Sequence, residues 1–151
     1  MPALLRSCTL VEASVTAGTP LLAAVQTLVE ARVAAVAVLG ENRRVVGLLS
    51  EDDVVRALFP GYLGDLHHTA FLDEESQLAA HADRLTPLPV EKAARSDAEP
   101  VPIDTSVIHV AQRFLHIDWG AVPVVDESDR FLGMLPQAEF IRVVVEHLPS
   151  R

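Results

Sequence analysis

The sequence predicts an α+β protein in which one β-α-β-β-α unit is written twice in tandem. Three observations lead to this prediction. The chain matches itself in a single register without gaps, each copy alternates helix-spaced and strand-like apolar patterns, and helix-start residues stand at corresponding places. In that register Gly47 falls on Gly133, an offset of 86 residues. We therefore expect two halves with the same secondary structure.

Identical residues support this register along most of both copies. The identical pairs include Val15 with Val101, Thr19 with Thr105, Gln26 with Gln112, Val38 with Val124, Arg44 with Arg130, Leu49 with Leu135 and Arg56 with Arg142. Conservative pairs such as Leu48 with Met134 keep the apolar pattern between the identities. Chance is a poor explanation for so long an ungapped match.

In the first copy, Thr19 is expected to cap a helix that has Pro20 at its first position. Apolar residues then recur at helical spacing, which gives this helix one buried face. Residues 34–39 (AAVAVL) predict a buried strand, and residues 45–49 predict the strand that returns after a turn. A second helix is expected to begin at Ser50, where a short hydroxyl precedes acidic residues that suit the positive end of the helix dipole.

The second copy repeats this order. A helix is expected over residues 105–117, strands over residues 121–125 and 131–135, and a closing helix over residues 136–147.

The chain is accordingly divided into three parts. We assign the first repeat to residues 10–59, an insertion to residues 60–99 and the second repeat to residues 100–148. The insertion contains a helical pattern over residues 74–85. We expect it to pack on the repeats, because long structureless connections are uncommon in compact domains.

The composition of the chain excludes several classes of function. Its 151 residues are 50% hydrophobic and 22% charged, as in folded globular proteins. A net charge of −9 argues against nucleic-acid binding, which needs clustered Lys and Arg. No apolar run approaches the roughly 20 residues that cross a bilayer, and a single cysteine, Cys8, cannot form an internal disulfide. We therefore expect a cytoplasmic protein with no nucleic-acid and no membrane partner.

Three segments resemble the CBS-domain family, whose members carry two such repeats in a pseudo-twofold-symmetric Bateman module. These segments are residues 15–21 (VTAGTPL), 47–53 (GLLSEDD) and 120–126 (GAVPVVD). The resemblance implies an adenosine-containing ligand, either AMP, ADP or ATP or S-adenosylmethionine, bound in a cleft between the repeats. It also implies a homodimer formed through the helices of the repeats.

The spacing Gly47-x-x-Ser50-x-x-Asp53 supports this chemistry on physical grounds. A strand that ends in a small hydroxyl at a helix N-terminus offers backbone N–H groups and a positive dipole end to a phosphate, which Ser50 would help to hold. Asp53, one helical turn later, can accept hydrogen bonds from both hydroxyls of a ribose, the usual role of this residue in the resembling family. The alternative is that Ser50 and Asp53 only cap the helix.

The remaining expectations for the first copy concern its apolar strand. The adenine ring is expected to lie against Ala35, Val36 and Ala37, with Val15 and Thr16 covering it.

The second copy departs from the motif. Pro136 and Glu139 stand at the equivalent positions, so the hydroxyl and one backbone N–H are missing and the carboxylate is one methylene further out. Glu139, with Val122 and Pro123 on the neighbouring strand, is a second candidate ribose site, and a solvated helix face is the alternative. We expect one ligand site, in the first copy, with the second copy serving mainly as scaffold.

Other reactive residues give weaker patterns. The histidines and acids of the insertion (His67, His68 and His81 with Asp65 and Asp73) lack the spacing of metal ligands, so no metal site is expected.

Three further residues, Trp119, Cys8 and Ser50, also carry side chains that can take part in a site. Trp119 is expected in the core, the alternative being that it closes the neighbouring cleft. Cys8 is expected to be inert, and Ser50 lacks the surroundings of a hydrolase nucleophile.

The sequence thus predicts a regulatory, ligand-sensing module that requires no cofactor, has no catalytic residue and passes ligand occupancy to a protein effector. The alternative is a ligand-free protein-interaction module. A third hypothesis is a metal-dependent or hydrolytic enzyme that acts through His67 or His68.

Overall fold

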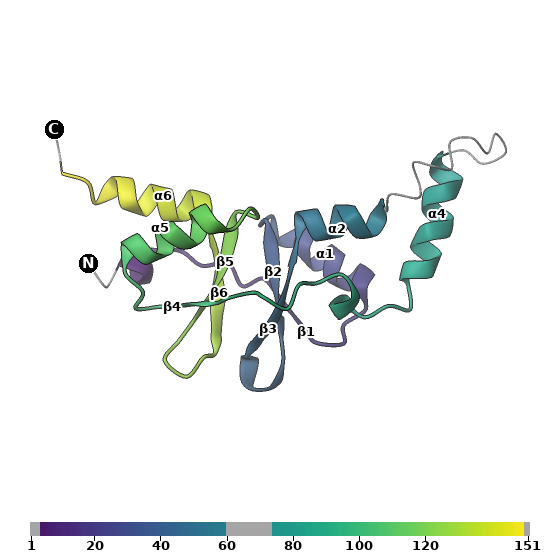
Figure 1. Cartoon of the computed structure of the whole chain (residues 1–151), viewed down its shortest axis with the longest axis horizontal. Helices are drawn as coiled ribbons and strands as arrows, with labels where there is room; N and C mark the ends of the chain where they lie inside the picture. Colours follow the sequence, from purple (N-terminus) through teal and green to yellow (C-terminus); the bar gives the residue numbers. More distant parts are fainter. Residues whose placement is uncertain (1–3, 60–73, 150–151) are drawn as a thin grey trace.

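Two three-stranded sheets, each accompanied by helices, make up the computed structural model, which describes residues 4–59 and 74–149 (Figure 1). The first repeat contains β1 (Ser14–Thr16), α1 (Leu21–Ala31), β2 (Ala35–Leu39), β3 (Val45–Ser50) and α2 (Glu51–Leu58). The second contains β4 (Val101–Pro102), α5 (Val107–His116), β5 (Ala121–Val125), β6 (Phe131–Pro136) and α6 (Gln137–Glu146). The predicted α+β class and the duplicated β-α-β-β-α order are confirmed.

The duplication extends to the details of strand pairing. In each sheet the first strand runs parallel to the second, and the second runs antiparallel to the third. The register shifts between Val38 and Leu39 in one sheet and between Val124 and Val125 in the other, which are equivalent places. The two repeats therefore share an irregularity as well as a topology.

The middle strands β2 and β5 are buried along their whole length, as their continuous apolar runs predict. The two hairpins stand side by side in the middle of the molecule, with the helices of each repeat to either side (Figure 1). Ala121, Phe131 and Met134 of the second repeat belong to the same buried cluster as the first repeat's core. Part of the second repeat is thus buried with the first repeat's core, whereas most of its other buried residues form a second cluster with Leu4, Leu5 and Cys8.

Each repeat is entered by a segment that crosses to the other repeat. Val11 forms a bridge with Met134 on β6, with backbone hydrogen bonds of 2.9 and 2.8 Å, and Arg95 forms one with Leu48 on β3, with two of 2.9 Å. A Cβ atom on Gly47 would lie 3.0 Å from the Arg95 carbonyl oxygen.

The same restriction applies at the equivalent glycine of the second repeat. A Cβ on Gly133 would lie 2.6 Å from the Cβ of Leu10. The two glycines that define the repeat register therefore stand where a crossing segment leaves no room for a side chain.

The start of α1 differs from the prediction that Thr19 caps it. The cap residue is Pro20, in an extended conformation with ψ 136°, and no side chain caps the helix. The Leu21 N–H instead donates to the Leu88 carbonyl at 2.8 Å, and the Val90 N–H donates to the Thr19 carbonyl at 2.8 Å. The insertion supplies the hydrogen bond that a cap would supply, because it lies directly beside this turn.

The helix α4 (Glu74–Leu85) covers the residues over which a helix was expected in the insertion. It projects at one end of the molecule and contacts α2 (Figure 1). The His81 Nε2 atom lies 2.7 Å from the Ala57 carbonyl oxygen, and Leu85 is buried in the first repeat's core. Within the described residues, no helix is both long enough and apolar enough to cross a bilayer.

Candidate functional site

Ser50 and Asp53 meet where β3 passes into α2. The Ser50 hydroxyl accepts the Asp53 backbone N–H at 3.2 Å, and the Ser50 backbone N–H donates to Asp53 Oδ2 at 3.0 Å. The Ser50 hydroxyl also donates to the same carboxylate oxygen at 2.8 Å. The helix-capping contacts that formed the alternative reading of this motif are therefore all present.

Arg95, which the sequence did not single out, binds the Asp53 carboxylate. Its Nη2 donates to Oδ1 at 3.0 Å and its Nε donates to Oδ2 at 3.3 Å, which makes a bidentate ion pair between the guanidinium and the carboxylate. The side chains are 22% and 9% exposed, so solvent weakens this pair less than it weakens a surface pair. Arg56 lies farther from Asp53, at 3.7 Å.

Asp53 carries a negative charge despite its burial. Burial alone would raise the pKa of its carboxyl. The hydrogen bonds from Arg95 and from the Ser50 backbone and hydroxyl, with the charge of Arg95, outweigh this effect and hold the pKa below its ordinary value. Asp53 is thus an ionised acceptor at neutral pH, as binding a pair of hydroxyls requires.

The indole ring of Trp119, just before β5, lies against the Arg95 side chain of this ion pair. The guanidinium carbon of Arg95 lies 4.1 Å from the centre of the indole ring, a close cation–π contact. Trp119 is partly buried against the first repeat's core and also lines a neighbouring cavity, so it combines the core position expected for it with the alternative of closing a cleft. Its indole N–H is buried, and no hydrogen-bond acceptor for it is found in the described part of the chain.

A cavity of about 210 Å³ adjoins Trp119 and the start of α2. Its lining comes from both repeats and consists of Ala34, Glu51, Asp52, Asp118, Trp119 and Gly120. Ala34 and Gly120 are equivalent in the repeat register, so the cavity lies near the axis that relates the two halves. Three of its lining side chains are carboxylates, which makes it a poor place for several phosphates.

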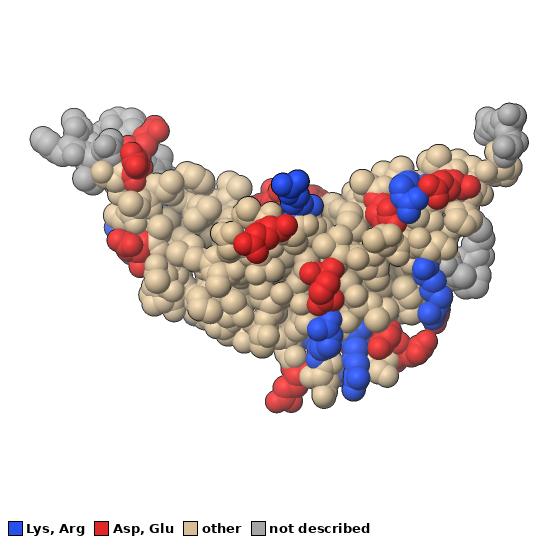
Figure 2. Space-filling model, turned by 180° about the vertical axis from the view of Figure 1, so that it is seen from behind, with Lys and Arg blue, Asp and Glu red and all other residues tan. Residues whose placement is uncertain are grey.

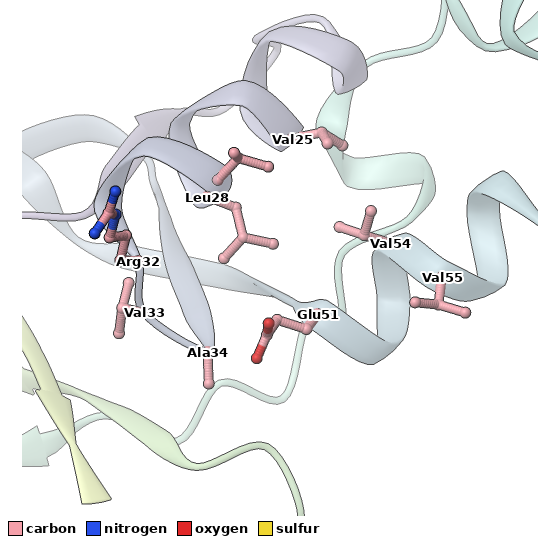
Figure 3. A pocket seen from close by; sticks show the side chains of 9 residues that line it. Val25, Leu28, Arg32, Val33, Ala34, Glu51, Val54 and Val55 are labelled. Carbon is pink, nitrogen blue, oxygen red and sulfur yellow. The ribbon is translucent and has the colours of Figure 1, made fainter. Parts of the chain in front are cut away.

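A larger cavity of about 500 Å³ lies between α1 and α2 (Figure 3). Val25 and Leu28 of α1 face Val54 and Val55 of α2 across it, and the polar side chains of Arg32 and Glu51 stand toward its other end (Figure 3). Val29, Val33 and Ala34 complete the lining. Its mostly aliphatic lining suits apolar side chains better than a charged nucleotide.

The other residues expected to contact a ligand in the first copy belong to the sheet. Ala35, Val36 and Ala37 have no exposed surface, and Val15 is 9% exposed, whereas Thr16 is exposed at the end of β1. None of the five lines either of the two cavities described above. Their contact with an adenine ring stays a prediction.

In the second copy, Glu139 is held by other partners. Its carboxylate accepts the Thr9 backbone N–H at 2.6 Å and two N–H groups of Arg142 at 2.8 Å each. The hydrogen bonds from Arg142, followed by the one from Thr9, lower the pKa of Glu139 to about 2. Pro136 caps α6 without a side-chain hydrogen bond.

The remaining candidates for the second site lie inside the sheet. Val122 and Pro123 are buried in β5. Whether this half binds a ribose stays a prediction.

The residues considered for metal binding or reactivity lie only partly within the described chain. His67, His68, Asp65 and Asp73 lie outside the described residues. In the ranges that are described, no group of three or more His, Cys, Asp or Glu side chains is arranged to hold a metal ion. Burial, followed by the charge of Glu139, raises the pKa of the Cys8 thiol, which suits the inert role expected for it.

Comparison with known sequences finds the same family domain twice along the chain. The sequence model of the CBS domain matches residues 11–60 and 90–146. No curated protein matches the chain.

Solved structures with two such repeats superpose on nearly the whole chain. The CBS-pair protein CBSX2 from Arabidopsis thaliana gives a TM-score of 0.73 at 18% identity, covering 95% of this chain and 94% of that one. A CBS domain-containing protein of unknown function from Kribbella flavida gives 0.71 at 24% identity, covering 93% and 96%. A structure of CBSX2 in complex with AMP gives 0.66 at 19% identity, covering 95% and 96%. At these identities the likeness establishes the fold alone.

Proposed function

We propose, given that this chain belongs to the CBS-domain family, that it is a regulatory module which binds an adenosine-containing ligand between its two repeats, at Ser50 and Asp53. CBS-pair modules are generally regulatory, and the comparisons indicate no catalytic family. The observation that carries the proposal is the Asp53 carboxylate, which is ionised, 9% exposed and paired with Arg95 of the segment that leads into the second repeat. The AMP complex of the similarly folded CBSX2 agrees with this choice of ligand class.

The charge around the site favours ligands with few phosphates. Glu51, Asp52 and Asp118 line the smaller cavity, and the Glu51 backbone N–H is already bonded to the Ala34 carbonyl at 2.9 Å. Each added phosphate would bring further negative charge toward these carboxylates. We therefore expect AMP to bind more tightly than ATP and expect the cationic S-adenosylmethionine to be tolerated.

A thermal-unfolding titration with AMP, ADP, ATP and S-adenosylmethionine tests this proposal. A ligand at 100 times its Kd should stabilise the folded protein by about 2.7 kcal/mol. Asp53→Asn should remove that stabilisation, because the amide loses half of the acceptor capacity and all of the charge. Asp83→Asn, on the exposed face of α4, is the matched control and should keep it. The absence of stabilisation by every ligand, or an unchanged response in Asp53→Asn, would refute the proposal.

We further propose that two copies associate through their helices. Several large apolar side chains on or directly after the helices are more than half exposed. They are Val29, Val55 and Phe59 in the first repeat and Ile108, Leu115, Ile141, Val145 and Leu148 in the second. Exposed apolar surface of this kind is typical of protein interfaces, and the aliphatic cavity between α1 and α2 adjoins it (Figure 3).

The surface charge bears on the proposed class of partner, and the cysteine bears on the proposed cellular location. Acidic and basic side chains are interspersed on the face shown in Figure 2, and the lack of a basic patch on that face supports the proposal that nucleic acid is not a partner. A cytoplasmic location is proposed because the single cysteine, Cys8, is a free thiol.

The second candidate function is a ligand-free module that binds a protein effector. One observation favours it: the Asp53 carboxylate already has hydrogen-bond donors from Ser50 and Arg95, as a purely structural carboxylate would. This candidate predicts that no adenosine-containing ligand binds even when Arg95 is replaced.

A further inference from the structure

The Arg95 side chain makes the two kinds of contact that a nucleoside would need at this site. Its guanidinium donates to both oxygens of Asp53, at 3.0 and 3.3 Å, as the two hydroxyls of a ribose would. Its planar group lies over the Trp119 indole at 4.1 Å, a position from which a base can also stack on an aromatic ring. One side chain of the protein thus occupies both a hydroxyl-binding and a ring-binding surface.

The backbone of Arg95 is fixed, whereas its side chain has room to leave. Two backbone hydrogen bonds of 2.9 Å join it to Leu48, and the missing side chain of Gly47 allows this close approach. The Arg95 side chain is 22% exposed, so part of it already contacts solvent. Rotation of the side chain therefore requires no change in the path of the chain.

A displaced Arg95 would also find other partners. The pKa of Arg95 is raised first by its hydrogen bond with Asp53, and the charges of Asp97 and Asp118 raise it further. Asp97 and Asp118 are both exposed. The guanidinium can therefore exchange one carboxylate for another instead of being left without a counter-charge.

In the second site, a threonine stands at the position equivalent to Arg95. Thr9 is equivalent to Arg95 in the 86-residue register, and it contacts Glu139 through its backbone N–H, at 2.6 Å. The side chain at this position is thus one of the features that distinguish the first site, together with Ser50 and Asp53 in place of Pro136 and Glu139. Replacing Arg95 with Thr copies into the first site the residue that the second site already has.

We propose that Arg95 is a built-in competitor for the nucleoside position and that a ligand reaches Asp53 only when the Arg95 side chain moves away toward Asp97 or Asp118. This inference rests on the proposed function and specifies how that site is regulated. The apparent affinity for the ligand is then the intrinsic affinity multiplied by the fraction of molecules in which Arg95 has left. If that fraction is about one in ten, the competitor weakens binding about tenfold.

Isothermal titration of the full chain with AMP and with adenosine tests the competitor. Arg95→Thr should bind both ligands about tenfold more tightly than the wild type. Arg95→Lys should also bind both more tightly, because an ammonium group offers neither a flat face nor a paired set of donors. Arg113→Thr is the matched control, since it breaks another partly exposed ion pair, with Glu99, and should leave both affinities unchanged. A far-ultraviolet circular dichroism spectrum of each variant checks that it is folded.

The outcomes separate this inference from the proposed function. Equal affinities in the wild type and Arg95→Thr would overturn the competitor while leaving the nucleoside site standing. Weaker binding of AMP by Arg95→Thr, with adenosine unchanged, would also overturn it and would make Arg95 a phosphate contact. Failure of both ligands to bind the wild type and both Arg95 variants would overturn the proposed function and the competitor together.

Discussion

Two carboxylates at equivalent positions of the repeats hold different partners. Asp53 binds Arg95 from the segment ahead of the second repeat, whereas Glu139 binds Arg142 from its own helix. Glu139 also accepts the backbone N–H of Thr9, which is the equivalent of Arg95. Each carboxylate therefore lies beside the equivalent crossing segment, whereas three pairs of side chains differ between the sites: Ser50 and Pro136, Asp53 and Glu139, and Arg95 and Thr9.

The contacts of Glu139 predict a loss of stability in acid. Its pKa is about 2 in the folded protein, against an ordinary value of 4.5. Because the folded pKa is lowered, the stabilisation is present above about pH 4.5 and is lost as the pH falls toward 2. Urea unfolding at a series of pH values should show Glu139→Gln less stable than the wild type at pH 7, by up to about 1 kcal/mol, with the difference shrinking below pH 4.5. A difference that is constant with pH would contradict this assignment.

The candidate site could be predicted only in part from single residues. Ser50 and Asp53 lie three positions apart at a strand-to-helix junction, so their proximity follows from local structure. Arg95 is 42 positions from Asp53, and their contact depends on how the chain crosses between the repeats. The signal that was present in the sequence is the 86-residue register, which aligns Arg95 with a threonine.

At the scale of elements, the order of helices and strands could be predicted from the sequence, whereas the segments that cross from one repeat to the other could not. Helices and strands have periodic apolar patterns, so the β-α-β-β-α order and the helix α4 could be predicted from the sequence. The crossing of Val11 to β6 and of Arg95 to β3 leaves no such pattern. Another contact between segments far apart in the sequence explains the wrong cap at Thr19, because the hydrogen bond at the start of α1 comes from Leu88.

The exposed faces of the helices predict an effect of charge on association. Val29→Glu and Val55→Glu place a carboxylate on side chains that are 63% and 56% exposed, so the monomer should fold as before. Each should weaken dimerisation by at least about tenfold, since burying an unpaired charge at an interface is costly. Sedimentation velocity across a concentration series measures this. Val46→Glu, at a side chain of β3 that is 47% exposed, is the control and should leave the dimer intact. A wild-type monomer at every concentration would contradict the helical interface.

At the scale of the whole molecule, residues of both repeats meet in one buried cluster and near one candidate site. Phe131 and Met134 of the second repeat are buried with the core of the first. Asp53 comes from the first repeat. Arg95 lies in the segment that leads into the second repeat, and Trp119 lies just before β5, the middle strand of the second repeat. A ligand that contacts Asp53 and Trp119 therefore touches both halves, which is how its occupancy can alter their packing.

A crystal structure of the chain with AMP tests the central claim most directly. We predict that the ribose hydroxyls bind Asp53, that the base lies against Trp119, and that the Arg95 side chain has left the carboxylate for Asp97 or Asp118. A structure at saturating AMP in which the Arg95–Asp53 pair is intact and no nucleotide lies between the repeats would contradict the account.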